Sequence, residues 1–219
     1  MLRFEDIKNS ETIKTYIRKA DESLIALGFT EHSFAHVGLV ARNCKMILSE
    51  LGYSEREQEI GCIASYLHDI GNLVNRVEHS QSGAIMAFRI LNEKKMAADE
   101  IAEIVTAIGN HDEGTGRPVS PIAAALIIAD KSDVRRSRVR NRDENSFDIH
   151  DRVNYSVRES KLIISEDKKT VTLVLDVDTN YSSVMDYFEI FMQRMIMCRN
   201  AAAALGMIFK LTINGQSLI

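Results

Sequence analysis

The chain has 219 residues, of which 45% are hydrophobic and 26% are charged, and its formal net charge is −4. This composition is typical of a globular protein with a substantial core, and it excludes a disordered tail, a collagen-like repeat and a disulfide-rich mini-protein. Tryptophan is absent, aromatic residues make up only 6%, and no overall basic charge is present, so nucleic-acid binding is disfavoured.

The N-terminus and the cysteines indicate in which cellular compartment the protein is expected. Charged residues at the start of the chain are followed by no apolar signal segment, and the longest apolar runs are too short to span a bilayer. Cys44, Cys62 and Cys198 form no closely spaced pair and lie among apolar neighbours, which favours small buried residues over a disulfide framework or a zinc site. We therefore expect a cytoplasmic protein without a membrane partner.

The first two thirds of the chain have the pattern of helices. Apolar residues recur at helical spacing in five segments, which predicts helices over residues 12–27, 33–51, 54–71, 82–94 and 99–108. Ser54 and Glu57 form a capping box at the start of the third segment. Ser120 and Pro121 begin another helix, which is apolar nearly all round and is therefore expected to be central and buried.

The pattern changes after about residue 158. Apolar and polar residues alternate along residues 170–178, and with residues 162–165 this predicts a β-hairpin. A helix over residues 183–205 and a strand over residues 207–215 follow.

The fold class is therefore predicted to be mainly α. We expect a helical domain over residues 1–145 and a small C-terminal α+β appendage over residues 146–219. Met185, Met192 and Met195 share one side of the late helix, which favours the core or a dimer interface over a ligand site, so a homodimer is one expectation.

The dipeptide His-Asp is unusually frequent in this chain. His68-Asp69 ends an apolar helix, where two titratable groups are costly to bury unless they are paired or bind a metal. His111-Asp112 follows another helix, while His150-Asp151 lies in a polar stretch and is expected to have no role in a site.

Further metal-ligand residues lie on or beside other helices. His36 is in the middle of one helix, His79 is at a helix start, and Asp130 closes the buried helix. Helix bundles build metal sites from such inward-pointing side chains, and imidazole and carboxylate groups both bind divalent metals. His32, four residues before His36, is expected to lie at the margin or the surface rather than to be a ligand.

This ordered series H…HD…H…H…D resembles the HD-domain metal-dependent phosphohydrolase superfamily over roughly residues 30–135. The residues that match its motifs are His36, the pair His68-Asp69, His79, His111 and Asp130. The resemblance implies two divalent metal ions, with iron or manganese preferred and zinc, nickel, cobalt or magnesium as alternatives.

The resemblance also implies a division of the ligands and a reaction. His36, His68 and Asp130 would bind one metal, His79 and His111 the other, and Asp69 would bridge them. A hydroxide activated by the metals would then attack a phosphomonoester, a phosphodiester or a nucleotide, so the expected partner is a small phosphorylated molecule.

The chain departs from one branch of this superfamily. HD-GYP members usually have lysine where this chain has Asn72, and their H-H-E motif is His111-Asp112-Glu113 here. The G-Y-P triplet is also missing near residues 116–118, which disfavours cyclic dinucleotide hydrolysis and leaves the substrate open.

Catalytic and substrate-binding roles are assigned beside the ligands. We expect Asp69, Asp112 and Lys131 to be catalytic, and Asn72, Lys131, Arg135 and Arg136 to bind substrate. The arginines belong to a basic run directly after Asp130, which fits either a phosphate clamp or a solvated face with salt bridges.

Two other functions remain open from the sequence. Some superfamily members with similar ligands are diiron oxygenases, and ligand types alone do not separate these from hydrolases. The distinct C-terminal appendage also fits a regulatory module that keeps the metal site and binds a nucleotide.

Overall fold

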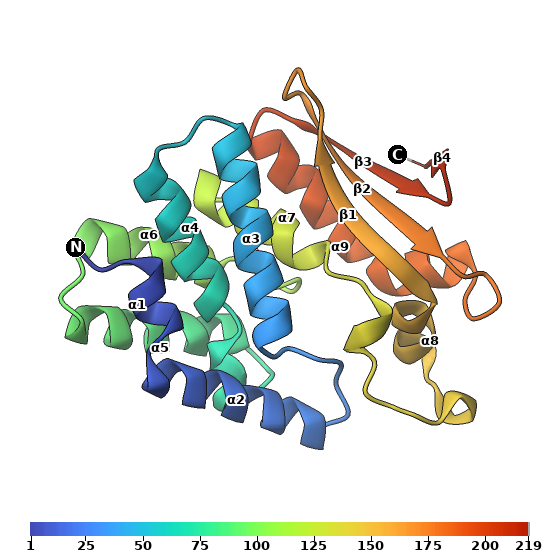
Figure 1. Cartoon of the computed structure of the whole chain (residues 1–219), viewed down its shortest axis with the longest axis horizontal. Coiled ribbons are helices and arrows are strands. Elements are labelled where there is room, and N and C mark those ends of the chain that lie inside the picture. Colours follow the sequence, from blue (N-terminus) through green and yellow to red (C-terminus); the bar gives the residue numbers. More distant parts are fainter. Residues whose placement is uncertain (219) are drawn as a thin grey trace.

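Nine α-helices and a small sheet form the described part of the chain, residues 1–218, in the computed structural model (Figure 1). The α-helices are α1 (Phe4–Lys8), α2 (Glu11–Ala26), α3 (Phe34–Glu50), α4 (Glu55–Leu67), α5 (His79–Glu93), α6 (Ala98–Gly109), α7 (Pro121–Lys131), α8 (Ile149–Ser156) and α9 (Val184–Ala204). Short 3-10 turns lie at η1 (Ile70–Leu73), η2 (Arg136–Arg138) and η3 (Glu144–Ser146). The strands are β1 (Val157–Ile164), β2 (Thr170–Val177), β3 (Ile208–Ile213) and β4 (Gln216–Ser217). The mainly α fold class is confirmed.

The central helix is α7, as its apolar composition predicts. Ser120 caps it by accepting a hydrogen bond from the backbone N–H of Ala123, and Pro121 occupies its first position. Every residue from Ile122 to Lys131 is buried, and the helix packs against α3, α4, α6 and α9. The last turn of this buried helix therefore places Asp130 and Lys131 inside the molecule.

The connection from α4 to α5 differs from the prediction. The helix expected over residues 54–71 ends at Leu67, and α5 begins at His79 rather than at residue 82. Its N-cap, Glu78, has a left-handed backbone with φ 55° and no capping side chain, so the usual start signal is missing. A Cβ at Gly71 would lie 2.0 Å from the carbonyl oxygen of His79, so only glycine lets η1 and α5 approach this closely.

The sheet has the strand order β1–β2–β3–β4 (Figure 1). β1 and β2 form the predicted antiparallel hairpin, whereas β2 and β3 are parallel and are joined by α9 as a crossover helix. Leu173 of β2 pairs with Leu211 of β3, and both are fully buried. The helix α9 packs on β3 and also on α7, so it lies between the sheet and the helical part of the chain.

Several elements were not expected from the sequence. They are α1, α8, the three 3-10 turns and β4, all of which are short. The division at residue 145 stays a prediction. Met195 is buried in the core, whereas Met185 is 74% exposed and Met192 is 46% exposed. Within residues 1–218, no helix combines the length and the hydropathy that a membrane span requires.

Candidate metal centre

Six side chains of metal-ligand type converge on one buried point between the helices. They are His36 on α3, His68 at the end of α4, Asp69 just before η1, His79 at the start of α5, His111 just after α6 and Asp130 on α7. None of the six is more than 8% exposed. Residues far apart in the sequence are therefore gathered by the packing of the helices, and the loops contribute only at helix ends.

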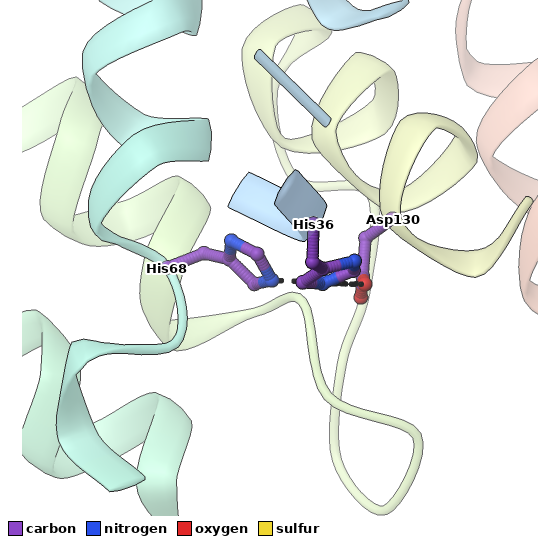
Figure 2. Close-up of side chains that lie close together, drawn as sticks. All are labelled: His36, His68 and Asp130. Carbon is purple, nitrogen blue, oxygen red and sulfur yellow. Dashed lines mark ion pairs between the residues drawn. The ribbon is translucent and has the colours of Figure 1, made fainter. Parts of the chain in front are cut away.

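One part of the centre consists of His36, His68 and Asp130, and Figure 2 shows these side chains pointing toward one another. Oδ1 of Asp130 lies 3.3 Å from Nε2 of His36 and 3.6 Å from Nε2 of His68. Ligands that bind one divalent ion at about 2 Å stand at such separations from each other. These three atoms thus form a group that fits a single metal ion.

Asp69 connects this group to the second pair of histidines. Its Oδ2 lies 3.3 Å from Nε2 of His68 and 3.5 Å from Nε2 of His36. Its Oδ1 lies 3.3 Å from Nε2 of His79, which is itself 3.2 Å from Nε2 of His111. The two oxygens of one carboxylate therefore face two different sets of imidazole nitrogens.

Backbone carbonyl groups fix the orientation of three of the imidazole rings. The Nδ1 atoms of His68, His79 and His111 lie 2.7, 3.0 and 2.6 Å from the carbonyl oxygens of Ser65, Arg76 and Ile108. Because a carbonyl oxygen only accepts hydrogen bonds, Nδ1 is the protonated nitrogen in each ring. In the neutral ring, Nε2 then has the free lone pair that a metal ligand needs.

The fourth ring, that of His36, is held by a carboxylate instead. Its Nδ1 lies 2.7 Å from Oδ2 of Asp133, which is buried. Burial would raise the pKa of Asp133, but Arg138 and His36 hold it well below its usual value, so the group stays ionised. Asp133 was missed by the sequence reasoning, although it follows Asp130 by three residues in the same segment.

The centre contains buried polar atoms that lack partners. Nε2 of His36, Nε2 of His68 and Oδ2 of Asp69 are inaccessible to solvent and form no well-directed hydrogen bond within residues 1–218. Leaving such atoms unpaired in a protein interior is costly, whereas a cation between them would satisfy all three. Four imidazoles with two carboxylates suit iron, manganese and other first-row metals, so the donor set fits the implied ions.

The protonation of the rings also reflects the concentration of carboxylates. Burial alone would lower the pKa of His36, but Asp130, Asp133 and Asp69 raise it to about 9. Burial likewise opposes a charge on His68, yet Asp69 and Asp130 raise its pKa to about 10. Without a metal, the neighbouring carboxylates therefore keep these two imidazole rings protonated.

A cavity of about 20 Å³ adjoins the ligands. Besides four of the ligands, its lining includes His32, Arg76, Glu113, Lys131, Arg138 and Arg194. Four of these are cations, and the lining also holds the carboxylates of Asp69, Glu113 and Asp130. Lys131, which the sequence singled out, lies here with Nζ 2.8 Å from Oδ2 of Asp130.

The other predicted functional residues lie at different distances from the centre. Asn72 donates hydrogen bonds to Oδ1 and to the carbonyl oxygen of Asp69, so it positions that carboxylate. Asp112 lies with Oδ1 3.9 Å from Nε2 of His79. Neither Arg135 nor Arg136 lines the cavity: Arg135 pairs with Asp133 and Glu31, and Arg136 stacks on Tyr155.

The two histidines that were not predicted to be metal ligands lie in different places. His32 lines the cavity, and its Nδ1 lies 2.7 Å from the carbonyl oxygen of Thr30. His150 is exposed on α8. Arg194 was not anticipated at all, although its spacing from Phe191 and Cys198 places a charge on the buried face of α9, which is an unusual position for a cation.

The part of the chain that carries these six side chains is similar to known proteins. The family model described as HD domain matches residues 33–135. A protein of Methanocaldococcus jannaschii named Uncharacterized protein MJ1020 is 29% identical over 174 residues. That alignment covers 68% of this chain and 66% of the relative, so the chain spans slightly less than two thirds of that protein. Residues 33–135 are therefore similar to HD domains, and the match is consistent with the HD-domain metal-dependent phosphohydrolase superfamily.

Proposed function

We propose that this protein is a metal-dependent phosphohydrolase that uses two divalent metal ions to cleave a phosphomonoester, a phosphodiester or a nucleotide. The observation that carries the proposal is the position of Asp69. Its Oδ2 faces His36 and His68 while its Oδ1 faces His79, which is the arrangement that a bridging carboxylate requires.

The ligands divide into two groups in this proposal. His36, His68 and Asp130 hold one ion, and His79 and His111 hold the other, with Asp69 shared between them. Iron or manganese is preferred. Such a pair of ions supplies the polarisation of water and of the phosphoryl oxygens at this point.

The remaining residues act on protons and charge. Partial burial would raise the pKa of Asp112, but Lys131 and His79 hold it below its usual value, so Asp112 is ionised and can accept a hydrogen bond that orients the attacking water. The ammonium group of Lys131 neutralises charge on the phosphoryl oxygens. Asn72 keeps the carboxylate of Asp69 in its orientation through two hydrogen bonds.

Reconstitution and a phosphoester panel test this proposal. Metal-free protein loaded with manganese(II), or anaerobically with iron(II), is expected to hydrolyse at least one member of the panel. His68→Ala and Asp69→Ala are expected to abolish this activity and lower the metal content. His150→Ala is the matched control, because it removes an exposed histidine from another His-Asp pair and is expected to change neither. Full activity without metal, or no activity on any phosphoester, would refute the proposal.

A diiron oxygenase is the second candidate, because a buried set of four imidazoles and two carboxylates suits two iron ions in either reaction. The two functions differ in their need for redox chemistry. Turnover by the zinc-loaded protein would exclude the oxygenase, whereas oxygen consumption that requires iron would exclude the hydrolase. A regulatory module would instead retain a bound nucleotide through purification and turn over no substrate.

A further inference from the structure

Arg194 brings the C-terminal part of the chain into the metal centre. It lies on α9, outside residues 33–135 that match the HD-domain model, yet it lines the same cavity as His79, His111 and Asp130. The helix α9 packs directly on α7, which ends in Asp130 and Lys131 (Figure 1). The ligand set is therefore complete within residues 33–135, but the wall of the cavity is not.

The guanidinium group of Arg194 is held in place with one edge free. It stacks on the ring of the buried residue Phe191, with Cζ 4.4 Å from the ring centroid. Its Nε donates a hydrogen bond to Oε1 of Glu113 over 2.7 Å. Among the residues that the structure describes, none accepts a hydrogen bond from its two Nη groups, and the side chain is 23% exposed. A stacked guanidinium with free N–H groups is a common binding group for phosphate.

Glu113 occupies the position next to this free edge. The same Oε1 that accepts from Arg194 lies 3.8 Å from Nζ of Lys131. One carboxylate oxygen thus sits between two cations beside the cavity, as a phosphoryl oxygen of a bound substrate would. A phosphate group and the carboxylate of Glu113 would compete for the same two partners.

The loop that carries Glu113 also packs closely against α9. A Cβ at Gly116 would lie 2.8 Å from Cε of Met197, and 2.4 Å from the carbonyl oxygen of Asp112. Only glycine therefore allows this loop to turn so tightly against the helix. The loop begins at His111, so the contact with α9 lies within five residues of a proposed metal ligand.

We propose that Arg194 binds the phosphoryl group of the substrate, and that Glu113 is a competing carboxylate that is displaced when this group binds. The C-terminal part of the chain then completes the substrate site rather than merely covering residues 33–135. This inference rests on the proposed phosphohydrolase function for its choice of ligand. It requires that the effects of changing Arg194 and Glu113 have opposite signs.

Binding of inorganic phosphate to the manganese-loaded protein tests the inference without requiring turnover. Calorimetry, after excess metal has been removed, is expected to show that Arg194→Ala weakens phosphate binding roughly 10- to 100-fold, because hydrogen bonds from a charged donor are lost. Arg194→Lys is expected to restore part of the loss. Glu113→Gln is expected to tighten binding about threefold or more, since the competing charge is removed.

The controls separate binding from structure. Arg199→Ala removes an exposed arginine from the same helix and is expected to leave phosphate binding unchanged. In the double variant Glu113→Gln/Arg194→Ala, the gain from Glu113→Gln is expected to disappear, because the two residues act on one ligand. Once a substrate is found, Arg194→Ala is expected to raise KM more than it lowers kcat.

The outcomes distinguish this inference from the proposed function. If no phosphoester is hydrolysed but Arg194→Ala still weakens phosphate binding, the hydrolase proposal fails and the proposed phosphate site is supported. If the enzyme is active while wild type and Arg194→Ala bind phosphate equally, the inference fails alone. It also fails if the metal-loaded wild type binds no phosphate, or if Glu113→Gln weakens binding while the metal content is unchanged.

Discussion

Nδ1 of His36 and Oδ2 of Asp133 are 2.7 Å apart, and both side chains are buried. This contact orients the imidazole of His36 so that Nε2 faces Asp69 and Asp130. A carboxylate in this position also raises the basicity of a ligand histidine. Asp133 thus acts on the proposed metal centre without being one of its ligands.

Asp133→Asn is expected to lower the affinity for metal roughly 10- to 100-fold, because the amide is neutral and orients the ring less strongly. Competition with a chelating dye would measure the loss. Asp143→Asn is the control, since Asp143 is exposed and asparagine caps a helix equally well. Equal affinities for wild type and Asp133→Asn would show that the contact has no influence on the metal.

Metal binding is expected to release protons. The pKa of His36 is raised to about 9 and that of His68 to about 10, so both rings are protonated at neutral pH in the metal-free protein. A metal binds only the neutral ring, so affinity is expected to rise from pH 6 to pH 8.5 and to level off near those pKa values. Titrations in buffers of different ionisation enthalpy would count the protons. A heat of binding that is independent of the buffer would contradict this prediction.

Gly71→Ala is expected to destabilise the protein by about 2–3 kcal/mol, because the new Cβ would meet backbone atoms of His79 and Gly83. Metal affinity is expected to fall as well, since His79 would be displaced. Gly38→Ala is the matched control, because only the end of the Arg42 side chain lies near that position in α3. Alanine there is expected to be neutral or to stabilise by up to about 1 kcal/mol. Chemical unfolding curves would compare the two variants, and similar curves would rule out the steric explanation.

The three cysteines are expected to be unreactive in the native protein. Cys44, Cys62 and Cys198 are free and buried, and burial raises the pKa values of Cys44 and Cys198 to about 12. Since the thiolate is the reactive form, an aromatic disulfide reagent at pH 8 is expected to modify none of them rapidly. In denaturant all three are expected to react. Rapid modification of the folded protein would show that one thiol is accessible.

The local signals in the sequence account for most of the helical part. Regular apolar spacing predicted α2, α3, α4, α6, α7 and α9, because each of these helices buries one face or nearly all of its surface. The start of α5 was wrong because Glu78 provides no capping side chain, and its contact with Gly71 is not local. Short elements such as α8 and β4 lack a full period of apolar residues, so no pattern marked them.

The ligands of the candidate site were predictable from the sequence, but the residues around them were not. All six ligand-type residues that the sequence singled out meet in space, because each stands out as a polar residue beside an apolar helix segment. Asp133 and Arg194 were not found, since their importance depends on which ring or cavity they reach in three dimensions. Arg135 and Arg136 follow Asp130 closely in the sequence, but the chain turns at η2 and neither side chain lines the cavity beside the ligands.

The helix α9 is anchored at both ends by parallel strands of the sheet, β2 before it and β3 after it. The connections to these strands, residues 178–183 and 205–207, limit how far it can move along α7. The sheet contains none of the six ligands, but by holding α9 it fixes the position of the guanidinium group of Arg194. A chain that ends before β3 would keep all six ligands, but Arg194 would no longer be held in its position at the cavity.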